Sequence, residues 1–373
     1  MRIALATGIF PPDIGGPALY SRKLAEEFSA AGNKVLILTY GKKFSHTDKY
    51  RIFGVSRSWP YGLRQFMYFA GLILNRGDYD VILAFDSLGA GLPAVLAGKL
   101  LNKKVAIRMG GDFLWEKFIE SGSGSVTMEE FYKKNLQKNY PVLFRLIRYA
   151  LRNSSRVIFT TDFQRDIFIP HYGLEDDRVV VISNAFVKEP GIISGQDGDR
   201  KTILWAGRFI KLKNLPFLID VFRRLSAGKR NLTLRLIGDG PEKEAVRRLA
   251  ESEDLKGRVL ISDSMEEGVL SEEINRAYFC VLPSLSEVSP NFALKCLGLN
   301  KPVVITQETG IKKEFPGLMY SDPKNKESFY QSMLRLLDDN SYDNYKKFIL
   351  NLKTEKTWTD LSGEYLRNLS SLS

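Results

Sequence analysis

The chain has 373 residues, a hydrophobic fraction of 44% and a formal net charge of +11 at pH 7. This length favours two domains, and the apolar content is typical of a globular protein and excludes a disordered chain. Residues 1–187 carry 25 Lys and Arg against 17 Asp and Glu, whereas residues 188–373 carry 29 against 26, so an anionic partner is expected on the first half.

Short apolar runs alternate with amphipathic segments along the first half. The segment YSRKLAEEFSAAG has the helical period, with Gly32 as its expected C-terminal cap. The longest apolar stretch, 81–98, is interrupted by Asp86 and Pro93, so no transmembrane helix is expected. The first half therefore predicts a parallel sheet covered by helices on both faces. Its expected strands are RIALAT, KVLILTY, DVILAF, KVAIRM and RVIFTT.

Residues 133–156 form a basic stretch without acidic residues. Such a stretch is able to lie on an anionic membrane leaflet, and the alternative is an ordinary helix packed on the first domain. Residues 61–76 present the same two alternatives. Nucleic acid is not expected as the anionic partner, because zinc-finger spacing, an RNA-binding aromatic signature and a basic tail are missing from the sequence. The apolar residues that support the membrane interpretation of 133–156 are Leu143, Phe144, Leu146, Ile147 and Leu151.

The second half restarts the alternation of strands and helices, with strands expected at TILWAG, LTLRLIG, RVLIS, FCVLPS and PVVIT. The sequence therefore predicts an α/β chain with two Rossmann-like, doubly wound domains facing a central cleft. We expect a first domain at 1–187, a linker at 188–200, a second domain at 201–354 and a last helix at 355–373.

Glycines follow two of the predicted strands. Gly15 and Gly16 precede the first helix, where backbone N–H groups favour a phosphate or a polar sugar. Gly238 and Gly240 form a strand-to-helix turn in the second half. In both places the alternative is a plain turn without a ligand.

Two cations follow the strand TILWAG. Arg208 comes directly after it and Lys213 precedes the next helix, so both are candidates to hold a diphosphate. A solvated basic loop is the alternative interpretation. The segment PSLSEVSPNF, which follows the strand FCVLPS, places one carboxylate, Glu287, among small residues before a helix.

The order of these segments resembles that of the family four retaining glycosyltransferases, which have the GT-B fold. The resemblance covers nearly the whole chain and is carried by the segments PPDIGGPALYSRKLAEEFSAAGNKV, SNAFV, AGRFIKLKN, IGDGPEKEAVRRL and PSLSEVSPNFALKCLGLNKPVV.

The resemblance implies that 1–187 is the acceptor-side domain, that 201–354 is the nucleotide-sugar-binding domain and that the last helix, 355–373, crosses back to the first domain. It also implies roles for the candidate residues. Glu287 would face the donor sugar, Arg208 and Lys213 would hold the diphosphate and stabilise its developing charge, and Gly16 would contact the donor phosphate or the acceptor. Transfer would proceed at the front face with retention, without a metal, a cofactor or a protein nucleophile. The groups expected to meet the sugar and diphosphate after Glu287 belong to Ser289, Pro290, Asn291 and Phe292.

The sequence departs from the family pattern at three places. Lys295 stands where a second carboxylate usually grips the ribose. Asp112 substitutes for a histidine that often faces the donor sugar, and its alternative role is a helix cap before Phe113. The usual Asn-Gly-Val segment has become Asn184-Ala185-Phe186.

The resemblance implies transfer of a hexosyl-type sugar from a nucleotide-sugar donor to a glycan or lipid-linked acceptor, in cell-surface polysaccharide or glycolipid synthesis. The alternatives are a non-catalytic glycosyltransferase-like binding protein and a sugar-nucleotide epimerase of the same fold. Cys280 and Cys296 have apolar neighbours and no nearby histidines, so no metal site is expected and a reducing compartment fits best. We expect a cytoplasmic protein, peripheral to the inner face of the cell membrane if 133–156 contacts lipid.

Overall fold

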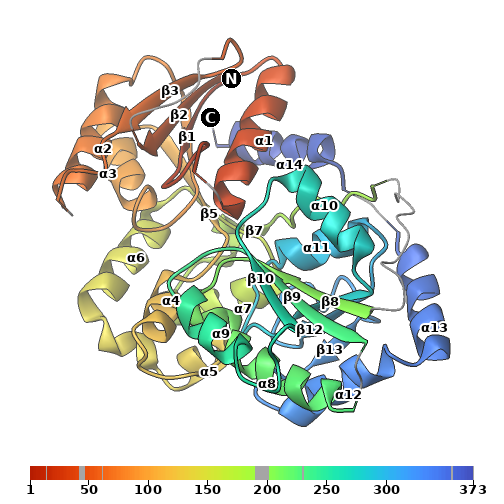
Figure 1. Cartoon of the computed structure of the whole chain (residues 1–373). Helices are drawn as coiled ribbons and strands as arrows, with labels where there is room; N and C mark the ends of the chain where they lie inside the picture. The colour runs from red at the N-terminus through yellow and green to blue at the C-terminus, as the bar shows by residue number, and fades with distance from the viewer. Residues whose placement is uncertain are drawn as a thin grey trace. The chain divides into compact units, whose positions relative to one another are not determined.

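A computed structural model of the chain describes residues 1–13, 15–41, 47–60, 62–189, 201–228, 231–353 and 356–372. The chain divides into two units, each built on its own parallel sheet (Figure 1). Unit 1 comprises Met1–Leu114, Asn135–Ala185 and Lys356–Ser373. Unit 2 comprises Trp115–Lys134 and Phe186–Glu355.

Unit 1 contains a seven-stranded sheet with the order β3-β2-β1-β4-β5-β6-β7. Every pair is parallel, and in the register Ile3 of β1 lies opposite Val35 of β2 on one side and Val81 of β4 on the other. The central strands are apolar and buried because helices cover both faces of a parallel sheet. The strands are β1 (Arg2–Ala6), β2 (Lys34–Tyr40), β3 (Arg51–Val55), β4 (Val81–Ala84), β5 (Lys104–Met109), β6 (Arg156–Phe159) and β7 (Val179–Val181).

The helices of unit 1 connect these strands, and the last helix of the chain joins them. They are α1 (Gly16–Ala30), α2 (Leu63–Leu74), α3 (Gly91–Leu101), η1 (Leu136–Asn139), α6 (Pro141–Asn153), α7 (Asp162–Tyr172), η2 (Asp176–Arg178) and α14 (Trp358–Ser370).

The helix α14 packs against α1, as Figure 1 shows at the end of unit 1. The rings of Tyr20 and Trp358 lie 5.2 Å apart, and the Tyr20 and Tyr365 hydroxyl oxygens lie 3.3 Å apart. Arg108 of β5 is buried beside them and donates hydrogen bonds to the Tyr365 hydroxyl and to Asn184 Oδ1. The C-terminal helix is therefore part of the unit 1 core, which agrees with the expected return of 355–373 to the first domain.

Unit 2 contains a six-stranded parallel sheet with the order β10-β9-β8-β11-β12-β13. Its strands are β8 (Lys201–Ala206), β9 (Leu232–Ile237), β10 (Val259–Ser262), β11 (Phe279–Leu282), β12 (Val303–Thr306) and β13 (Met319–Ser321). Its helices are α5 (Met128–Lys133), η3 (Lys211–Lys213), α8 (Leu215–Ser226), α9 (Lys243–Ala250), α10 (Glu267–Arg276), α11 (Asn291–Gly298), α12 (Lys326–Arg335) and α13 (Asp339–Leu350), and α4 (Phe113–Glu120) enters it from unit 1.

One segment of the first half groups with the second sheet. The sequence predicts that all of 1–187 lies in the first domain, whereas residues 115–134 belong to unit 2, where they form hydrogen bonds with its loops. The expected linker at 188–200 lies outside the described residues except for 188 and 189. No helix among the described residues is both long and apolar enough to cross a membrane.

Candidate functional site

Two loops of unit 2 lie side by side at the carboxyl ends of neighbouring strands. Residues 207–214 follow β8 and residues 283–290 follow β11, and these two strands pair in parallel, so both loops leave the same edge of the sheet. The Leu285 N–H donates to the Leu212 carbonyl at 2.9 Å, and Asn214 Nδ2 donates to the Pro283 carbonyl at 3.2 Å. The structure therefore joins the loops that carry Lys213 and Glu287.

Lys213 and Glu287 form an ion pair. Lys213 Nζ donates to Glu287 Oε1 at 2.5 Å, and the Ser284 hydroxyl donates to the same oxygen at 2.6 Å. The side chains retain 22% and 11% of their exposure, so solvent screens this pair less than a surface pair. Two candidates that are 74 residues apart in the chain thus share one hydrogen-bonded cluster.

A third loop fixes the backbone of Glu287. Its N–H donates to the Glu308 carbonyl at 2.8 Å, and its own carbonyl accepts from the Gly310 N–H at 2.9 Å. Residues 307–310 follow β12, the neighbour of β11, so they leave the sheet at the same edge. Burial, with the nearby Glu129 and Glu130 carboxylates, raises the pKa of Glu308. The position of Glu287 is therefore set by backbone bonds as well as by its side chain.

Arg208 is exposed in the loop that also carries Lys213, and its side chain makes no hydrogen bond or ion pair to any residue that the structure describes. Its loop is held by the two glycines predicted to bind the donor. A Cβ at Gly238 would lie 1.8 Å from the Gly207 carbonyl oxygen, and a Cβ at Gly240 would lie 2.4 Å from that of Phe209. These glycines have φ angles of 144° and 153°, so their absent side chains let the Arg208 loop pack closely. A donor contact at either glycine stays a prediction.

The helix α11 begins directly after the Glu287 loop. Pro290 has no N–H group, so this residue offers no backbone donor, and the donors that the prediction requires at the helix start come from Asn291 and Phe292. Ser289 precedes them in the same loop. Contact of these residues with a sugar or diphosphate stays a prediction.

Lys295 lies on α11 and pairs with an acidic residue. Its Nζ lies 3.2 Å from Glu267 Oε1, at the first residue of α10. A carboxylate is therefore present beside the position where the family pattern has one, although it comes from another helix. Sequence spacing gave no sign of this pairing.

Residues 115–134, which we call the strap, contact both loops that carry the candidate residues. Glu120 Oε2 accepts from the Lys211 N–H at 3.2 Å, and Glu120 Oε1 accepts from the Leu212 N–H at 3.1 Å. The Met128 N–H donates to the Ser286 hydroxyl at 2.9 Å, and both residues are buried. The strap therefore forms hydrogen bonds with the residues next to Lys213 and next to Glu287.

The remaining candidates belong to unit 1. Gly15 has a φ of 153° and precedes α1, and Gly16 is the first residue of that helix, with Pro17 next to it. Asp112 is buried, and its Oδ1 accepts from the Leu114 N–H at 2.9 Å. Asp112 thus caps α4, which was the alternative weighed for it, and its contact with a donor sugar stays a prediction.

The described residues include no group of three or more His, Cys, Asp or Glu side chains arranged to hold a metal ion. The cluster around Glu287 instead offers one carboxylate, one ammonium and a nearby guanidinium. Such a set is suited to bind an anion and to hydrogen-bond a hydroxyl group.

Comparisons with known proteins identify the family of the chain. The profile of the Glycosyltransferase Family 4 matches residues 14–187, and that of Glycosyl transferases group 1 matches residues 200–339. Together these profiles match more than half of the chain. The chain therefore belongs to the family four, or group 1, glycosyltransferases, and its fold is GT-B.

Individual relatives are distant. The chain is 25% identical over 178 residues to the alpha-D-kanosaminyltransferase of Streptomyces kanamyceticus, an alignment that covers 44% of this chain and 46% of that enzyme. It is 24% identical over 336 residues to the phosphatidylinositol N-acetylglucosaminyltransferase GPI3 subunit of Saccharomyces cerevisiae, covering 85% of this chain and 70% of the yeast subunit. The structure of Anabaena Alr3699/HepE in complex with UDP and glucose has a TM-score of 0.76 at 15% identity and full coverage of both chains.

Proposed function

We propose that the chain transfers a hexosyl-type sugar from a nucleotide-sugar donor to a glycan or lipid-linked acceptor with retention of configuration. The observation that carries this proposal is the Lys213–Glu287 ion pair, whose Lys213 shares its loop with the exposed Arg208. Two cations at the carboxyl edge of a parallel sheet suit a diphosphate, and a carboxylate suits the hydroxyl groups of the attached sugar. The structure of Alr3699/HepE, a complex with UDP and glucose, supports the same class of donor.

Arg208, Lys213 and Glu287 have different roles in the proposed reaction. Arg208 and Lys213 bind the diphosphate and stabilise the negative charge that grows on it as the glycosidic bond breaks. Glu287 holds Lys213 in place before the donor binds and accepts hydrogen bonds from the donor sugar afterwards. The leaving phosphate takes up the acceptor proton, so the proposal includes neither a protein nucleophile nor a metal ion.

The acceptor belongs, in this proposal, to cell-surface polysaccharide or glycolipid synthesis. The yeast relative is named as a transferase acting on phosphatidylinositol, which supports a lipid-linked acceptor. The two cysteines, Cys280 and Cys296, are free and buried, which fits a reducing cytoplasmic compartment.

Contact with an anionic membrane is proposed for three helices of unit 1. The apolar residues Ile147 and Leu151 of α6 are buried in the fold and are therefore not available to lipid, which narrows the prediction made for 133–156. The helix α3 lies next to both α2 and α6. The exposed apolar residues of these helices are Leu63, Phe66, Met67 and Leu74 of α2, Leu96 and Leu100 of α3, and Val142, Leu146 and Tyr149 of α6.

Slow hydrolysis of labelled nucleotide sugars tests the proposal. A thermal-shift screen against UDP, GDP, ADP and their sugars first identifies the nucleotide, because a ligand that binds the folded state raises the melting temperature. The matching donor should then release its sugar, and EDTA should leave that rate unchanged. Binding of the nucleotide without any release of sugar would favour a non-catalytic binding protein and contradict the proposal.

A further inference from the structure

Asn214 follows Lys213 directly and has a left-handed backbone conformation. Its φ and ψ angles are 57° and 37°, a region that asparagine tolerates better than most residues other than glycine. Asn214 is also the residue before α8, but its side chain makes no capping hydrogen bond to that helix. The side-chain amide therefore serves other partners.

The Asn214 amide connects two other loops of unit 2. Its Nδ2 donates to the Pro283 carbonyl at 3.2 Å and to the Pro323 carbonyl at 2.9 Å. Pro283 follows β11 and Pro323 follows β13, and both prolines are buried. In the sheet β11 is the neighbour of β8, whereas β13 is two strands further away. One side chain from the loop after β8 thus reaches the loops that follow two other strands.

These contacts favour the arrangement that brings Lys213 to Glu287. An amide nitrogen has two N–H donors, so the two carbonyls match its full capacity. A buried carbonyl that loses its donor costs free energy, because water does not replace the lost hydrogen bond. The amide therefore stabilises the three loops in contact. Lys213 precedes Asn214, and Glu287 lies four residues after Pro283, so the same contacts set the distance between the two charged residues.

We propose that Asn214 is a positioning residue that holds Lys213 where it meets the diphosphate of the donor. Lys213 has a long and flexible side chain, so the place of its charge depends on a fixed backbone below it. Asn214 fixes that backbone through its own conformation and through its amide. The role of Lys213 in this inference rests on the proposed function. The connection of the three loops rests on the hydrogen bonds alone.

Hydrogen exchange of the full chain, measured by mass spectrometry, tests the connection of the loops. Asn214→Gly keeps the left-handed conformation, which glycine adopts readily, and removes both amide donors. Asn214→Asp keeps the size of the side chain and replaces the donor nitrogen with an acceptor oxygen. Both variants should lower the protection of 207–214 and 283–290 about tenfold. The melting temperature should stay near that of the parent, because opening of these loops is local.

Asn102→Gly is the control for the change of residue type. Asn102 is exposed after α3 in unit 1 and also has a left-handed conformation, with a φ of 52°. The substitution therefore repeats the backbone effect of Asn214→Gly without its loss of hydrogen bonds to the loops of unit 2. It should leave the protection of 207–214 and 283–290 unchanged.

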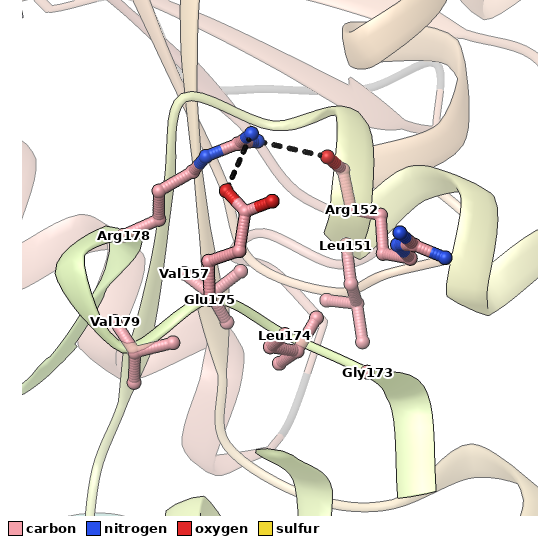
Figure 2. Close-up of a pocket in the computed structure, with 8 residues that line it drawn as sticks. All are labelled: Leu151, Arg152, Val157, Gly173, Leu174, Glu175, Arg178 and Val179. Atoms are coloured by element: carbon pink, nitrogen blue, oxygen red, sulfur yellow. Dashed lines mark hydrogen bonds and ion pairs between the residues drawn. The ribbon is translucent and has the colours of Figure 1, made fainter. Parts of the chain in front are cut away.

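Arg178 provides a second control, a side chain of unit 1 that also binds a backbone carbonyl. It donates to the Arg152 carbonyl at 3.0 Å and pairs with Glu175 at 2.8 Å (Figure 2). The hollow beside these bonds has a volume of only about 10 Å³, which is too small for a ligand. Arg178→Gln should therefore lower protection near Arg178 and leave the rate of nucleotide release unchanged.

The rate of nucleotide release from the matching sugar donor tests whether Asn214 acts through Lys213. Asn214→Gly should lower this rate about tenfold, whereas Asn102→Gly and Arg178→Gln should keep the parent rate. In a protein that already carries Lys213→Ala, adding Asn214→Gly should change the rate less than about twofold, because the group to be positioned is absent. A loss of folded protein would instead lower the rate by the same factor in both backgrounds.

Three outcomes would overturn the inference. They are unchanged protection in both Asn214 variants, a parent rate in Asn214→Gly, and a loss of rate that persists in the Lys213→Ala background. The proposed function fails separately. If the parent releases nucleotide from no donor, the proposed function is contradicted, and lower protection in the Asn214 variants would still support the connection of the loops. Turnover by the parent with unchanged protection in the variants would leave the proposed function standing and overturn the inference.

Discussion

Lys213 Nζ lies 2.5 Å from Glu287 Oε1, although the two residues belong to loops that follow different strands. The Glu287 carboxylate balances the positive charge of Lys213 until another anion competes for the Lys213 ammonium group. A diphosphate that draws Lys213 toward itself would free the Glu287 carboxylate for the hydroxyl groups of a sugar. Under the proposed function, the ion pair would therefore link binding of the diphosphate to exposure of the carboxylate.

Glu287→Gln should separate catalysis from nucleotide binding. The amide keeps the size of the side chain but loses its charge, so sugar transfer should fall about tenfold or more through weaker hydrogen bonds. Affinity for the nucleoside diphosphate should be equal or tighter, because a negative charge next to the phosphates is removed. Initial rates and calorimetric titration measure the two effects. Glu327→Gln is the control, because Glu327 of α12 forms an exposed ion pair with Arg224. An unchanged transfer rate in Glu287→Gln would show that Glu287 has no role in the reaction.

Glu120→Gln should weaken the hydrogen bonds between the strap and the loop that carries Lys213. The carboxylate accepts two backbone N–H groups, and the amide replaces one acceptor oxygen with a donor that faces an N–H. We expect kcat to fall about fivefold with little change in melting temperature, and Glu120→Asp to restore part of it. Glu129→Gln, on the same strap but paired with Lys133, should behave like the parent. A parallel fall of kcat and melting temperature would instead show that Glu120 only stabilises the fold.

Lys295→Glu should give equal or tighter affinity for the nucleotide, because the family pattern has a carboxylate at this position that binds the ribose hydroxyl groups. The new carboxylate would face Glu267, so the reciprocal variant Lys295→Glu with Glu267→Lys restores the pair and serves as the control. Calorimetric titration of the matching nucleotide measures both. If Lys295→Glu loses affinity as severely as Arg208→Ala, Lys295 is itself a phosphate or sugar contact.

Binding to liposomes should depend on their charge. Anionic vesicles should bind the chain in a salt-sensitive manner and neutral vesicles should not, because each cation near an anionic surface contributes about 1 kcal/mol. Arg145→Glu, at an exposed position on α6, should weaken binding, whereas Arg247→Glu on α9 should not. Vesicle cosedimentation measures the effect. Equal binding to both vesicle types, or to neither, would contradict the electrostatic argument.

The interior strands of both sheets and the edge strand β10 were predictable from the sequence, and the other three edge strands, β3, β7 and β13, were not. The runs predicted as strands are all strands, because parallel strands under two helix layers need continuous apolar residues. The edge strand β3 contains Gly54 and is only partly buried, and β7 and β13 have three residues each. Gly32 caps α1 as predicted, with a φ of 79°.

The site was partly predictable for a related reason. Lys213 and Glu287 could be found because each follows a strand, and the neighbouring positions of β8 and β11 in the sheet bring them together. Glu120 and Glu267 could not be found, because their partners, the backbone of Lys211 and Leu212 and the side chain of Lys295, are remote in sequence and no motif marks them. Gly238 and Gly240 were noticed as glycines of a turn, but their contact with the Arg208 loop required the structure.

The most direct test of the account is the rate of nucleotide release from the matching sugar donor by the parent and by Arg208→Ala. Arg208 is exposed, and its side chain makes no hydrogen bond or ion pair to any residue that the structure describes, so replacing it with alanine should leave the fold and melting temperature intact. Loss of one cation that stabilises the leaving diphosphate should lower the rate about 100-fold. Arg247→Ala, an exposed arginine paired with Glu244, should keep the parent rate. An Arg208→Ala protein that releases nucleotide as fast as the parent would contradict the assignment of this loop as the donor site.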